Sequence, residues 1–350
     1  MSRIYKTPIS DKMIEIGKES GKDNIIMAIE TSCDETACAI VKNGREILSN
    51  IVASQIKIHQ NYGGVVPEVA AREHLNAINM VIEEAYDQAK IKKEDITAYS
   101  ATVGPGLVGS LLVGLNAAKT LSLIYDKPFI GVNHLNAHVC ANYINTDLTP
   151  PFMSLLISGG HTQIIKVDDY EKQEIIGETI DDATGEVYDK VARLVGIPYP
   201  GGPNLDKMAK SGDKNAYILP VAKVKGEFDF SFSGLKTAVL NLSRKLLSEN
   251  NGVLPKENLA ASFQENITKT LFEKTLKAAR KYGMKQIVLA GGVAANSEIR
   301  AKFFSLESEG FKIYAPKMNL CTDNAAMVGA AAYFMEFGLN DLDIEVFSRC

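Results

Sequence analysis

Two histidines four residues apart are the strongest sign of chemistry in this chain. His134 and His138 follow a short apolar run, Phe129 to Val132, which Pro128 precedes. The run predicts a strand and the histidines predict the helix after it, a common place for functional groups in open α/β sheets. One helical turn separates the imidazoles, so both lie on one face and can bind one metal ion. The same spacing also suits histidines that only cap a helix or pack in a core.

A zinc protease is the obvious alternative for a helix with paired histidines. Its His-Glu-x-x-His pattern needs a glutamate directly after the first histidine as general base. Here that position is Leu135. A metal at this site would therefore orient or polarise a substrate without a hydrolytic base on the same helix.

Length, charge and cysteine content limit the class of protein. The chain has 350 residues, which favours two lobes over one core. Its 38 basic and 42 acidic residues give a net charge of -4, so any nucleic-acid contact must come from a local patch or from partner proteins. The five cysteines lack paired two-residue spacings, which favours a reducing compartment and argues against a zinc ribbon or a disulfide framework.

Two segments bear on the location of the protein. Residues 1–24 mix Lys with Asp and Glu, unlike a secretory signal or a transit peptide, and we expect a loose N-terminal extension. The most apolar stretch, Leu107 to Tyr125, is interrupted by Gly109, Asn116 and Lys119 and predicts a buried helix rather than a membrane span. We therefore expect a soluble cytoplasmic protein with no membrane contact.

Strand-like apolar runs alternate with helical patterns along the chain, which predicts an α/β architecture with an internal repeat. Residues Met153 to Val167 can be laid over Met27 to Val41, so that Ser158 falls on Ser32. Each copy is an apolar strand, a short polar turn and a second strand, as in a β-hairpin. Two such lobes would bring the backbone N–H groups of their turns towards a shared anion.

A pair of prolines marks the expected boundary between the lobes. Pro150 and Pro151 separate an N-terminal lobe, 25–150, from a C-terminal lobe with a helical insertion, 151–350.

One glycine-rich turn matches the motif of a dinucleotide-binding site. Gly104 to Gly109 matches G-x-G-x-x-G between a strand and a helix. The next strand, however, ends in Asn133 and His134 instead of the acidic residue that would hold a ribose. Pro105 also removes an N–H group that would bind pyrophosphate. A tight structural turn is the favoured interpretation.

Two later segments are better nucleotide candidates. Gln286 to Arg300 reads as a strand, a Gly-Gly turn and a helix with Asn296 near its start. Ile180 to Arg193 predicts an amphipathic helix whose polar face, including Asp189, would ordinarily only be solvated. The following loop, Pro200 to Asp206, could bring Gly202 and Asp206 to the same cleft. The apolar stripe expected in the core is Val187, Val191, Leu194 and Val195.

Eight segments, in order along the chain, strongly resemble the tRNA N6-adenosine threonylcarbamoyltransferase family. They are Glu30–Thr36 (ETSCDET), His134–His138 (HLNAH), Ser158–Gln163 (SGGHTQ), Gly185–Lys190 (GEVYDK), Tyr199–Pro203 (YPGGP), Phe232–Lys236 (FSGLK), Gly291–Asn296 (GGVAAN) and Cys321–Asn324 (CTDN). The resemblance runs from about Ile25 to the last helix. Its first segment resembles the bacterial and mitochondrial branch rather than the archaeal one.

The resemblance implies a fold and a reaction. The fold is α/β and actin-like, of the sugar kinase, Hsp70 and actin type, with two duplicated RNase H-like lobes around a nucleotide cleft. The reaction moves the threonylcarbamoyl group from threonylcarbamoyl-adenylate to N6 of the adenosine 3′ to the anticodon (position 37) in tRNAs that read codons beginning with A. It forms N6-threonylcarbamoyladenosine (t6A) and releases AMP.

The resemblance also implies site residues. His134, His138 and Asp323 would bind one divalent metal per subunit, Fe²⁺ or Zn²⁺, and Mg²⁺ could accompany a bound nucleotide. An acyl phosphate is already activated, so no protein nucleophile is needed. We interpret Cys33 as a turn residue and assign no catalytic residue beyond the metal site. The implied substrate-binding residues are Leu156, Ile157, Ser158, Gly159, Gly160, Asp189, Gly202, Asp206 and Asn296.

Partners follow from the resemblance as well, with tRNA and threonylcarbamoyl-adenylate as substrates. Bacterial relatives work with a smaller paralogue of like fold (TsaB type) and a separate P-loop ATPase (TsaE type), whereas mitochondrial relatives act as homodimers. Residues 135–137 differ from those commonest in relatives and the N-terminal extension is unusual. The sequence is compatible with either arrangement, the one with a paralogue and an ATPase or the homodimer.

Two other functions remain as alternatives. A metal-dependent peptidase predicts peptide-bond cleavage by the purified protein. A non-catalytic, nucleotide-gated module predicts that His138→Ala leaves partner binding and cellular function intact.

Overall fold

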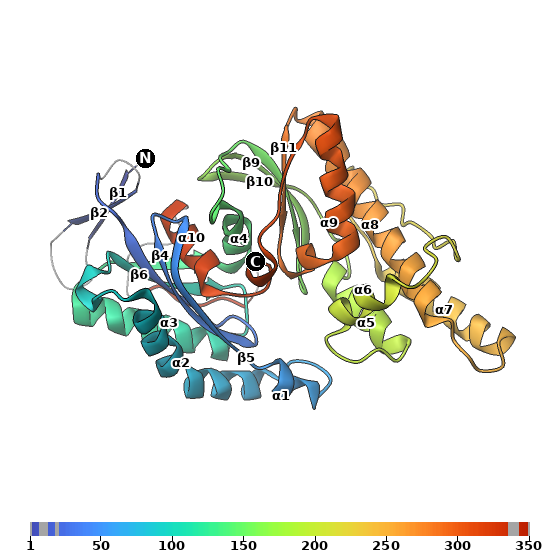
Figure 1. Ribbon diagram of the computed structural model, residues 1–350, viewed down its shortest axis with the longest axis horizontal. Coiled ribbons are helices and arrows are strands. Elements are labelled where there is room, and N and C mark those ends of the chain that lie inside the picture. Colours follow the sequence, from blue (N-terminus) through green and yellow to red (C-terminus); the bar gives the residue numbers. More distant parts are fainter. Residues whose placement is uncertain (1, 7–12, 18–20, 335–342, 349–350) are drawn as a thin grey trace. The chain divides into compact units, whose positions relative to one another are not determined.

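The computed structural model describes residues 2–6, 13–17, 21–334 and 343–348 (Figure 1). The chain divides into two compact units, each with its own sheet. Unit 1 comprises residues 1–149 and 322–350, and unit 2 comprises residues 150–321. The first boundary falls at the proline pair, Pro150-Pro151, where the sequence predicts it.

The sheet of unit 1 has the strand order β5-β4-β3-β6-β7. The first three strands pair antiparallel, and β6 and β7 continue the sheet in parallel. The central strands are apolar throughout because both of their faces are buried. The strands are β3 (Ile25–Glu30), β4 (Glu35–Lys42), β5 (Glu46–Ser54), β6 (Ala98–Gly104) and β7 (Phe129–Asn133).

Helices cover both faces of this sheet (Figure 1). Met27 and Ile40 point into the core that α2 and α3 complete. Their strand neighbours Ala28 and Val41 contact α10 instead, because successive side chains alternate between faces. The helices are α1 (Ile56–Gln60), α2 (Pro67–Ala89), α3 (Val108–Tyr125), α4 (His134–Cys140) and α10 (Ala325–Phe334), with 3₁₀ turns at Lys93–Asp95 and Ala141–Tyr143.

The C-terminal segment corrects the predicted division of the chain. The sequence assigns all of 151–350 to the second lobe, but residues 322–350 belong to unit 1. Helix α10 is rich in Ala and contains Gly329, and it therefore packs closely on β3 and β4. A Cβ atom on Gly329 would lie 2.8 Å from a methyl group of Val41. The close approach fixes α10, and with it Asp323, in unit 1.

The sheet of unit 2 repeats the topology of unit 1. Its strand order is β10-β9-β8-β11-β12, with the same sequence of two antiparallel and two parallel pairings. The hairpin β8–β9 corresponds to the segment that the sequence lays over β3–β4, so the predicted duplication is present in the structure. The strands are β8 (Phe152–Ile157), β9 (Thr162–Asp169), β10 (Lys172–Glu178), β11 (Gln286–Ala290) and β12 (Lys312–Tyr314).

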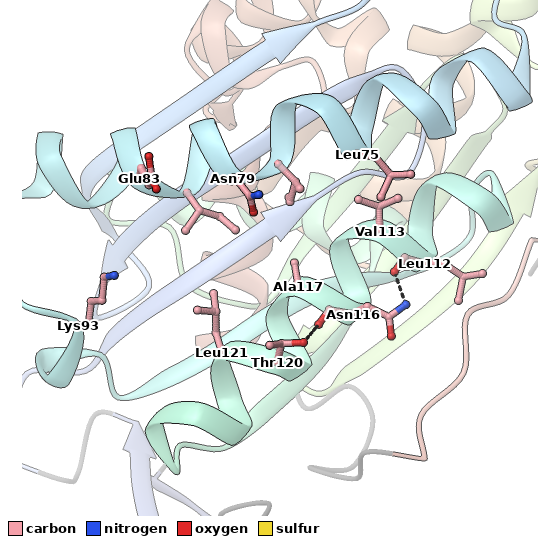
Figure 2. A pocket seen from close by; sticks show the side chains of 12 residues that line it. Leu75, Asn79, Glu83, Lys93, Leu112, Val113, Asn116, Ala117, Thr120 and Leu121 are labelled. Atoms are coloured by element: carbon pink, nitrogen blue, oxygen red, sulfur yellow. Dashed lines mark hydrogen bonds between the residues drawn. The ribbon is translucent and has the colours of Figure 1, made fainter.

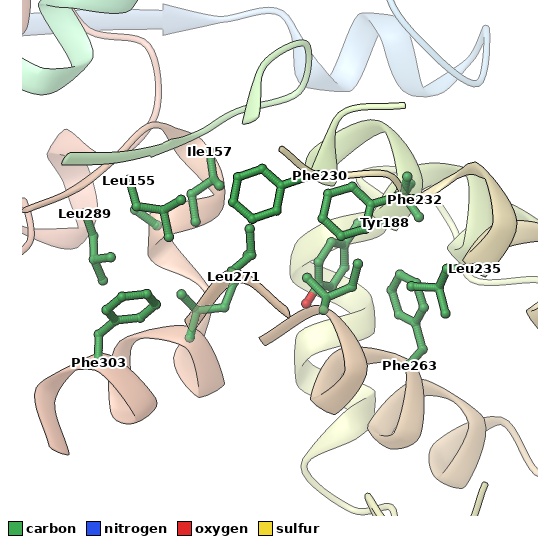
Figure 3. Packing of buried hydrophobic residues seen from close by; sticks show 14 of the residues in the cluster. Leu155, Ile157, Tyr188, Phe230, Phe232, Leu235, Phe263, Leu271, Leu289 and Phe303 are labelled. Carbon is green, nitrogen blue, oxygen red and sulfur yellow. The ribbon is translucent and has the colours of Figure 1, made fainter. Parts of the chain in front are cut away.

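An aromatic-rich core joins the helices of unit 2 to its sheet (Figure 3). Tyr188 and Phe263 meet edge to face with ring centroids 5.1 Å apart, a favourable arrangement. Leu194 is 41% exposed, so the stripe predicted for α5 is wrong at that position. The helices are α5 (Thr184–Leu194), α6 (Gly201–Ala209), α7 (Ser233–Glu249), α8 (Lys256–Lys281) and α9 (Ser297–Phe304), with 3₁₀ turns at Gly292–Ala295, Ser305–Glu309 and Met318–Leu320.

Three further predictions from the sequence can be compared with the structure: those for the N-terminal extension, for helix α3 and for the cysteines. The described part of the N-terminal extension is not loose: β1 (Ser2–Lys6) and β2 (Met13–Gly17) form an antiparallel hairpin, while 7–12 and 18–20 lie outside the described residues. Helix α3 is long and apolar enough to cross a membrane. It packs against α2 and β6, but only 33% of it is buried, less than the sequence predicts for a buried helix. The described part of the chain contains no disulfide, and Cys350 lies outside it.

Candidate metal centre and nucleotide-binding turns

A side-chain cap starts the helix that carries the two histidines. Strand β7 ends at Asn133, whose Oδ1 accepts hydrogen bonds from the backbone N–H of Leu135 at 2.9 Å and of Asn136 at 3.3 Å. This cap fixes the start of α4 at His134, because it satisfies two N–H groups that have no partner inside the helix. His138 then lies one turn further on the same face.

Asp323 completes a group of three possible metal ligands within unit 1. Its Oδ1 lies 3.2 Å from Nε2 of His138 and 3.6 Å from Nε2 of His134. The three donor atoms lie within 4.8 Å of one another. Donors about 2.1 Å from one ion are separated by about 3.0 to 3.4 Å. The two distances from Asp323 are close to this range, so the group could hold a single small divalent ion. Two imidazoles and a carboxylate suit Fe²⁺ or Zn²⁺ and leave coordination positions open.

A buried carboxylate, Glu30, contacts His134 on the side opposite Asp323. Oε2 of Glu30 lies 3.2 Å from Nδ1 of His134 and accepts a hydrogen bond from Thr102 Oγ1 at 2.6 Å. Oε1 accepts from the backbone N–H of Ser32 at 2.5 Å. The Ser32 hydroxyl is also 3.1 Å from Nδ1 of His134. The sequence reading gave Glu30 no role of its own, although an acidic residue that ends an apolar strand is a usable signal.

Charges at this centre shift the pKa values of its members. Burial alone would lower the pKa of His134, but the carboxylates of Asp323 and Glu30 raise it to about 9. Burial would raise the pKa of Asp323, but the two histidines lower it to about 2. Without a metal ion, His134 is therefore an imidazolium at neutral pH, and a divalent ion must displace its proton.

The two histidines differ in their surroundings. His138 is 2% exposed, and its Nδ1 has no hydrogen-bond partner within the described residues. No group contacts Nδ1 of His138 there, whereas Glu30 and Ser32 contact Nδ1 of His134. Nearby, burial and the charge of Asp34 raise the pKa of the Cys33 thiol well above its usual value. A neutral thiol is a weak nucleophile, which agrees with a turn residue at Cys33.

In unit 2, the turn after β8 presents open backbone. A Cβ atom on Gly159 or Gly160 would meet nothing within 4 Å, and both residues are exposed. The Ser158 backbone N–H donates to the His161 carbonyl at 2.8 Å, which closes the turn. Leu156 and Ile157 have fully buried side chains, so only their backbone is available to a ligand.

Asp189 organises the start of α6. Its Oδ1 accepts from the backbone N–H of Gly201 at 2.8 Å and of Gly202 at 3.2 Å. Burial raises the pKa of Asp189, and these two N–H groups partly offset the increase. The amide of Gly202 is thus already bonded within the protein.

Asp206 and Asn296 are brought together through other side chains. Gln264 of α8 donates to Asp206 at 3.0 Å and accepts from Asn296 at 2.9 Å. Ser297 donates to Asp206 through its hydroxyl at 2.9 Å and through its backbone N–H at 3.3 Å. The sequence alone did not predict a role for Gln264, because the position of Gln264 in this network depends on contacts between four segments. All the residues implied for substrate belong to unit 2, and the three implied metal ligands belong to unit 1.

Comparison with known proteins identifies the family. Residues 46–330 match the family model described as tRNA N6-adenosine threonylcarbamoyltransferase. The chain belongs to this family. Proteins of that name from Clostridium perfringens (strain SM101) and Bacillus subtilis (strain 168) are 53% and 50% identical over 313 residues, covering 89% of this chain and 92% and 90% of theirs. The one from Gloeothece citriformis (strain PCC 7424) is 52% identical over 334 residues, or 93% of this chain and 96% of its own.

Solved structures share the fold of this threonylcarbamoyltransferase family member. Full-length HypF in its phosphate- and nucleotide-bound form superimposes with a TM-score of 0.60 at 13% identity, and T. kodakarensis HypF with 0.59 at 16%. They cover 95% and 94% of this chain, which spans 50% and 48% of theirs. Together with the repeated strand order, this likeness places the chain in the actin-like α/β fold with two duplicated lobes.

Family membership defines the reaction class. A tRNA N6-adenosine threonylcarbamoyltransferase transfers a threonylcarbamoyl group to an adenosine of tRNA. The chain is therefore a transferase that modifies tRNA, and tRNA is its substrate. Neither the family nor Leu135 beside the first histidine supports the peptidase alternative.

Proposed function

We propose that the chain transfers threonylcarbamoyl from threonylcarbamoyl-adenylate to N6 of the adenosine 3′ to the anticodon, with one divalent ion on His134, His138 and Asp323. The product is t6A in tRNAs that read codons beginning with A, and AMP is released. One observation carries the proposal: a chain of this family brings two imidazoles and one carboxylate to within 4.8 Å of one another. The cytoplasm, where the substrate tRNA is found, is the proposed location.

The metal ligands are held by the protein in a defined orientation. Glu30 contacts Nδ1 of His134 and leaves Nε2, which faces Asp323, to bind the ion. When bound, Fe²⁺ or Zn²⁺ would act as a Lewis acid that can polarise a carbonyl oxygen. The rigid cap of α4 by Asn133 keeps His134 and His138 on one face.

The adenylate is assigned to unit 2. The exposed backbone at Gly159 and Gly160 offers N–H groups to the phosphate, and Asp206 and Asn296 form the network assigned to the nucleoside. Mg²⁺ could accompany the nucleotide. In the reaction, the bond from N6 to the carbamoyl carbon forms, and the bond from that carbon to the phosphate oxygen breaks. AMP leaves with the electron pair and N6 loses a proton, so no covalent protein intermediate is needed.

The transfer is tested by supplying the purified protein with threonylcarbamoyl-adenylate, a tRNA that has adenosine after its anticodon, and candidate partners. Nucleoside mass spectrometry is expected to find t6A, with AMP formed in equal amount. The control is the same tRNA with guanosine at that position, which should remain unmodified. Absence of t6A with all components present, or equal labelling of the control tRNA, would contradict the proposal.

An apolar groove on unit 1 supports a second actin-like chain as partner. Helices α2 and α3 line a groove of about 660 Å³ (Figure 2). Two leucines that line it are open to solvent: Leu75 is 63% exposed and Leu112 42%. A smaller paralogue of like fold would bury this face. A separate P-loop ATPase completes the proposed set of partners.

Glutamate at Leu75 or Leu112 is expected to prevent this association. A charge in the centre of an apolar interface costs roughly 2 to 4 kcal/mol or more, which weakens binding at least about thirtyfold. Size-exclusion chromatography with light scattering measures the complex with the paralogue. Ile218→Glu is the matched control, because Ile218 is fully exposed in unit 2. Wild-type association by Leu75→Glu and Leu112→Glu would exclude this face as the docking site.

A further inference from the structure

A buried glutamine of α8 connects two residues of the proposed nucleoside site. Gln264 is 5% exposed. Its Nε2 donates to Oδ1 of Asp206 at 3.0 Å, and its Oε1 accepts from Nδ2 of Asn296 at 2.9 Å. An amide can donate on one side and accept on the other at the same time, which neither a carboxylate nor an apolar side chain can do. The chemistry of this position therefore calls for an amide.

Asn296 uses its whole hydrogen-bonding capacity within the protein. Besides the bond to Gln264, its Nδ2 donates to the Tyr188 hydroxyl at 3.3 Å. Its Oδ1 accepts from the backbone N–H groups of Glu298 and Ile299, both at 3.1 Å, and so caps α9. A primary amide has two donors and two acceptor positions, and all four are occupied. Asn296 has none left for a ligand in this arrangement.

Asp206 differs, because it keeps a free position. Oδ1 already accepts from Gln264 and from the Ser297 hydroxyl. Oδ2 accepts only from the backbone N–H of Ser297, at 3.3 Å. A carboxylate oxygen has two acceptor positions, so Oδ2 retains one among the contacts of the described residues. Of Asp206 and Asn296, Asp206 is therefore the one equipped to touch the nucleoside.

We propose that Gln264 is a positioning residue for adenylate binding, which holds Asp206 so that Oδ2 accepts from a donor group of the nucleoside. Asn296 acts through the same network by fixing Gln264, and does not contact the ligand through its side chain. This inference rests on the proposed function, which places the nucleoside at Asp206. It adds a residue on α8 to the substrate site and changes the role of Asn296 from contact to support.

The test compares Gln264→Leu and Gln264→Glu with wild type in the full chain with its partners. Calorimetry measures Kd for AMP, and the transfer assay gives KM for threonylcarbamoyl-adenylate and kcat. Both variants are expected to raise Kd and KM about tenfold while kcat stays within about twofold, since the defect is in binding. Thr275→Val is the matched control. Thr275 is also buried on α8, and among the described residues its hydroxyl bonds only to the Leu271 carbonyl of its own helix, so Kd of the variant should stay at the wild-type value.

A double-mutant cycle with Asp206→Asn separates positioning from general damage. If Gln264 acts through Asp206, Gln264→Leu adds less than about twofold to the loss of AMP affinity caused by Asp206→Asn. Losses that multiply independently would overturn the inference, as would wild-type Kd in both Gln264 variants while Asp206→Asn weakens binding. If Asp206→Asn itself leaves AMP affinity unchanged, the nucleoside assignment in the proposed function fails too. Thermal melts show whether each variant remains folded.

Discussion

Alanine in place of His138 is expected to lower the affinity for Fe²⁺ and Zn²⁺ by at least about a hundredfold and to abolish t6A formation with it. The change removes one of three donor atoms from a group that no other described His, Cys, Asp or Glu completes. Calorimetry with Zn²⁺, and metal analysis after anaerobic loading with Fe²⁺, measure the affinity. The nucleotide-gated alternative predicts instead that this variant functions normally.

Asn136→Ala is the control for this experiment. Asn136 lies on α4 between the histidines and is only half-buried, and it is not among the three possible metal ligands. Metal affinity should stay within about twofold of wild type. Loss of metal by Asn136→Ala to the same degree would mean that α4 tolerates no change, and the effect of His138→Ala could not be assigned to coordination.

The same centre predicts a pH dependence for the wild-type protein. The pKa of His134 is about 9 without a metal ion, and binding displaces the imidazolium proton. Below that pKa, each unit of pH increase should therefore tighten metal binding about tenfold. Above it, the proton is already absent and the affinity should level off. A flat profile between pH 7 and pH 9 would show that His134 loses no proton on binding.

Glu30→Gln is expected to weaken metal binding by about ten- to a hundredfold, although Glu30 touches no metal. The backbone N–H of Ser32 needs an acceptor at the position of Oε1, so the new amide nitrogen takes the place of Oε2. It would then donate to Nδ1 of His134, which moves the imidazole proton to Nε2, the nitrogen that faces Asp323. Calorimetry measures the affinity, and nitrogen-15 NMR of the imidazole reports the tautomer.

Thr102→Val is the control that separates the effect of Glu30→Gln on metal binding from an ordinary loss of packing around Glu30. It removes one hydrogen bond to Glu30 but leaves the contact of the carboxylate with His134. We expect a decrease of less than about threefold. Loss of the Glu30 charge should also lower the pKa of His134, so the pH profile of Glu30→Gln should level off at lower pH than that of wild type. Equal defects in both variants, with an unchanged tautomer, would contradict the role of Glu30.

The fold could be predicted where its signals are local. Apolar strands joined by short polar turns revealed the hairpins β3–β4 and β8–β9 and their duplication. The segment after residue 321 could not be placed in the same way. Its assignment to unit 1 depends on how closely the small residues of α10, such as Gly329, approach β3 and β4, and no local pattern contains that information. The pairing of β1 with β2 was missed for a similar reason, since it depends on contacts between two separate segments.

The site, like the fold, could be predicted from the sequence only where its signals are local. The spacing of His134 and His138 predicts a shared face from two residues alone, whereas Asp323 entered only through resemblance to a family. Glu30 and Gln264 gained their roles from contacts with segments far away in the sequence. Buried polar residues without an obvious local partner are therefore the positions at which the structure adds most to the sequence.

The most direct test of the account is t6A formation by the metal-loaded wild type and by His138→Ala, with equal saturating threonylcarbamoyl-adenylate, tRNA and partners. Nucleoside mass spectrometry quantifies the product, and metal analysis is made on the same samples. The account predicts t6A from wild type and less than about a hundredth of that rate from the variant, together with loss of its metal. Wild-type rates from a metal-free, folded His138→Ala protein would contradict it.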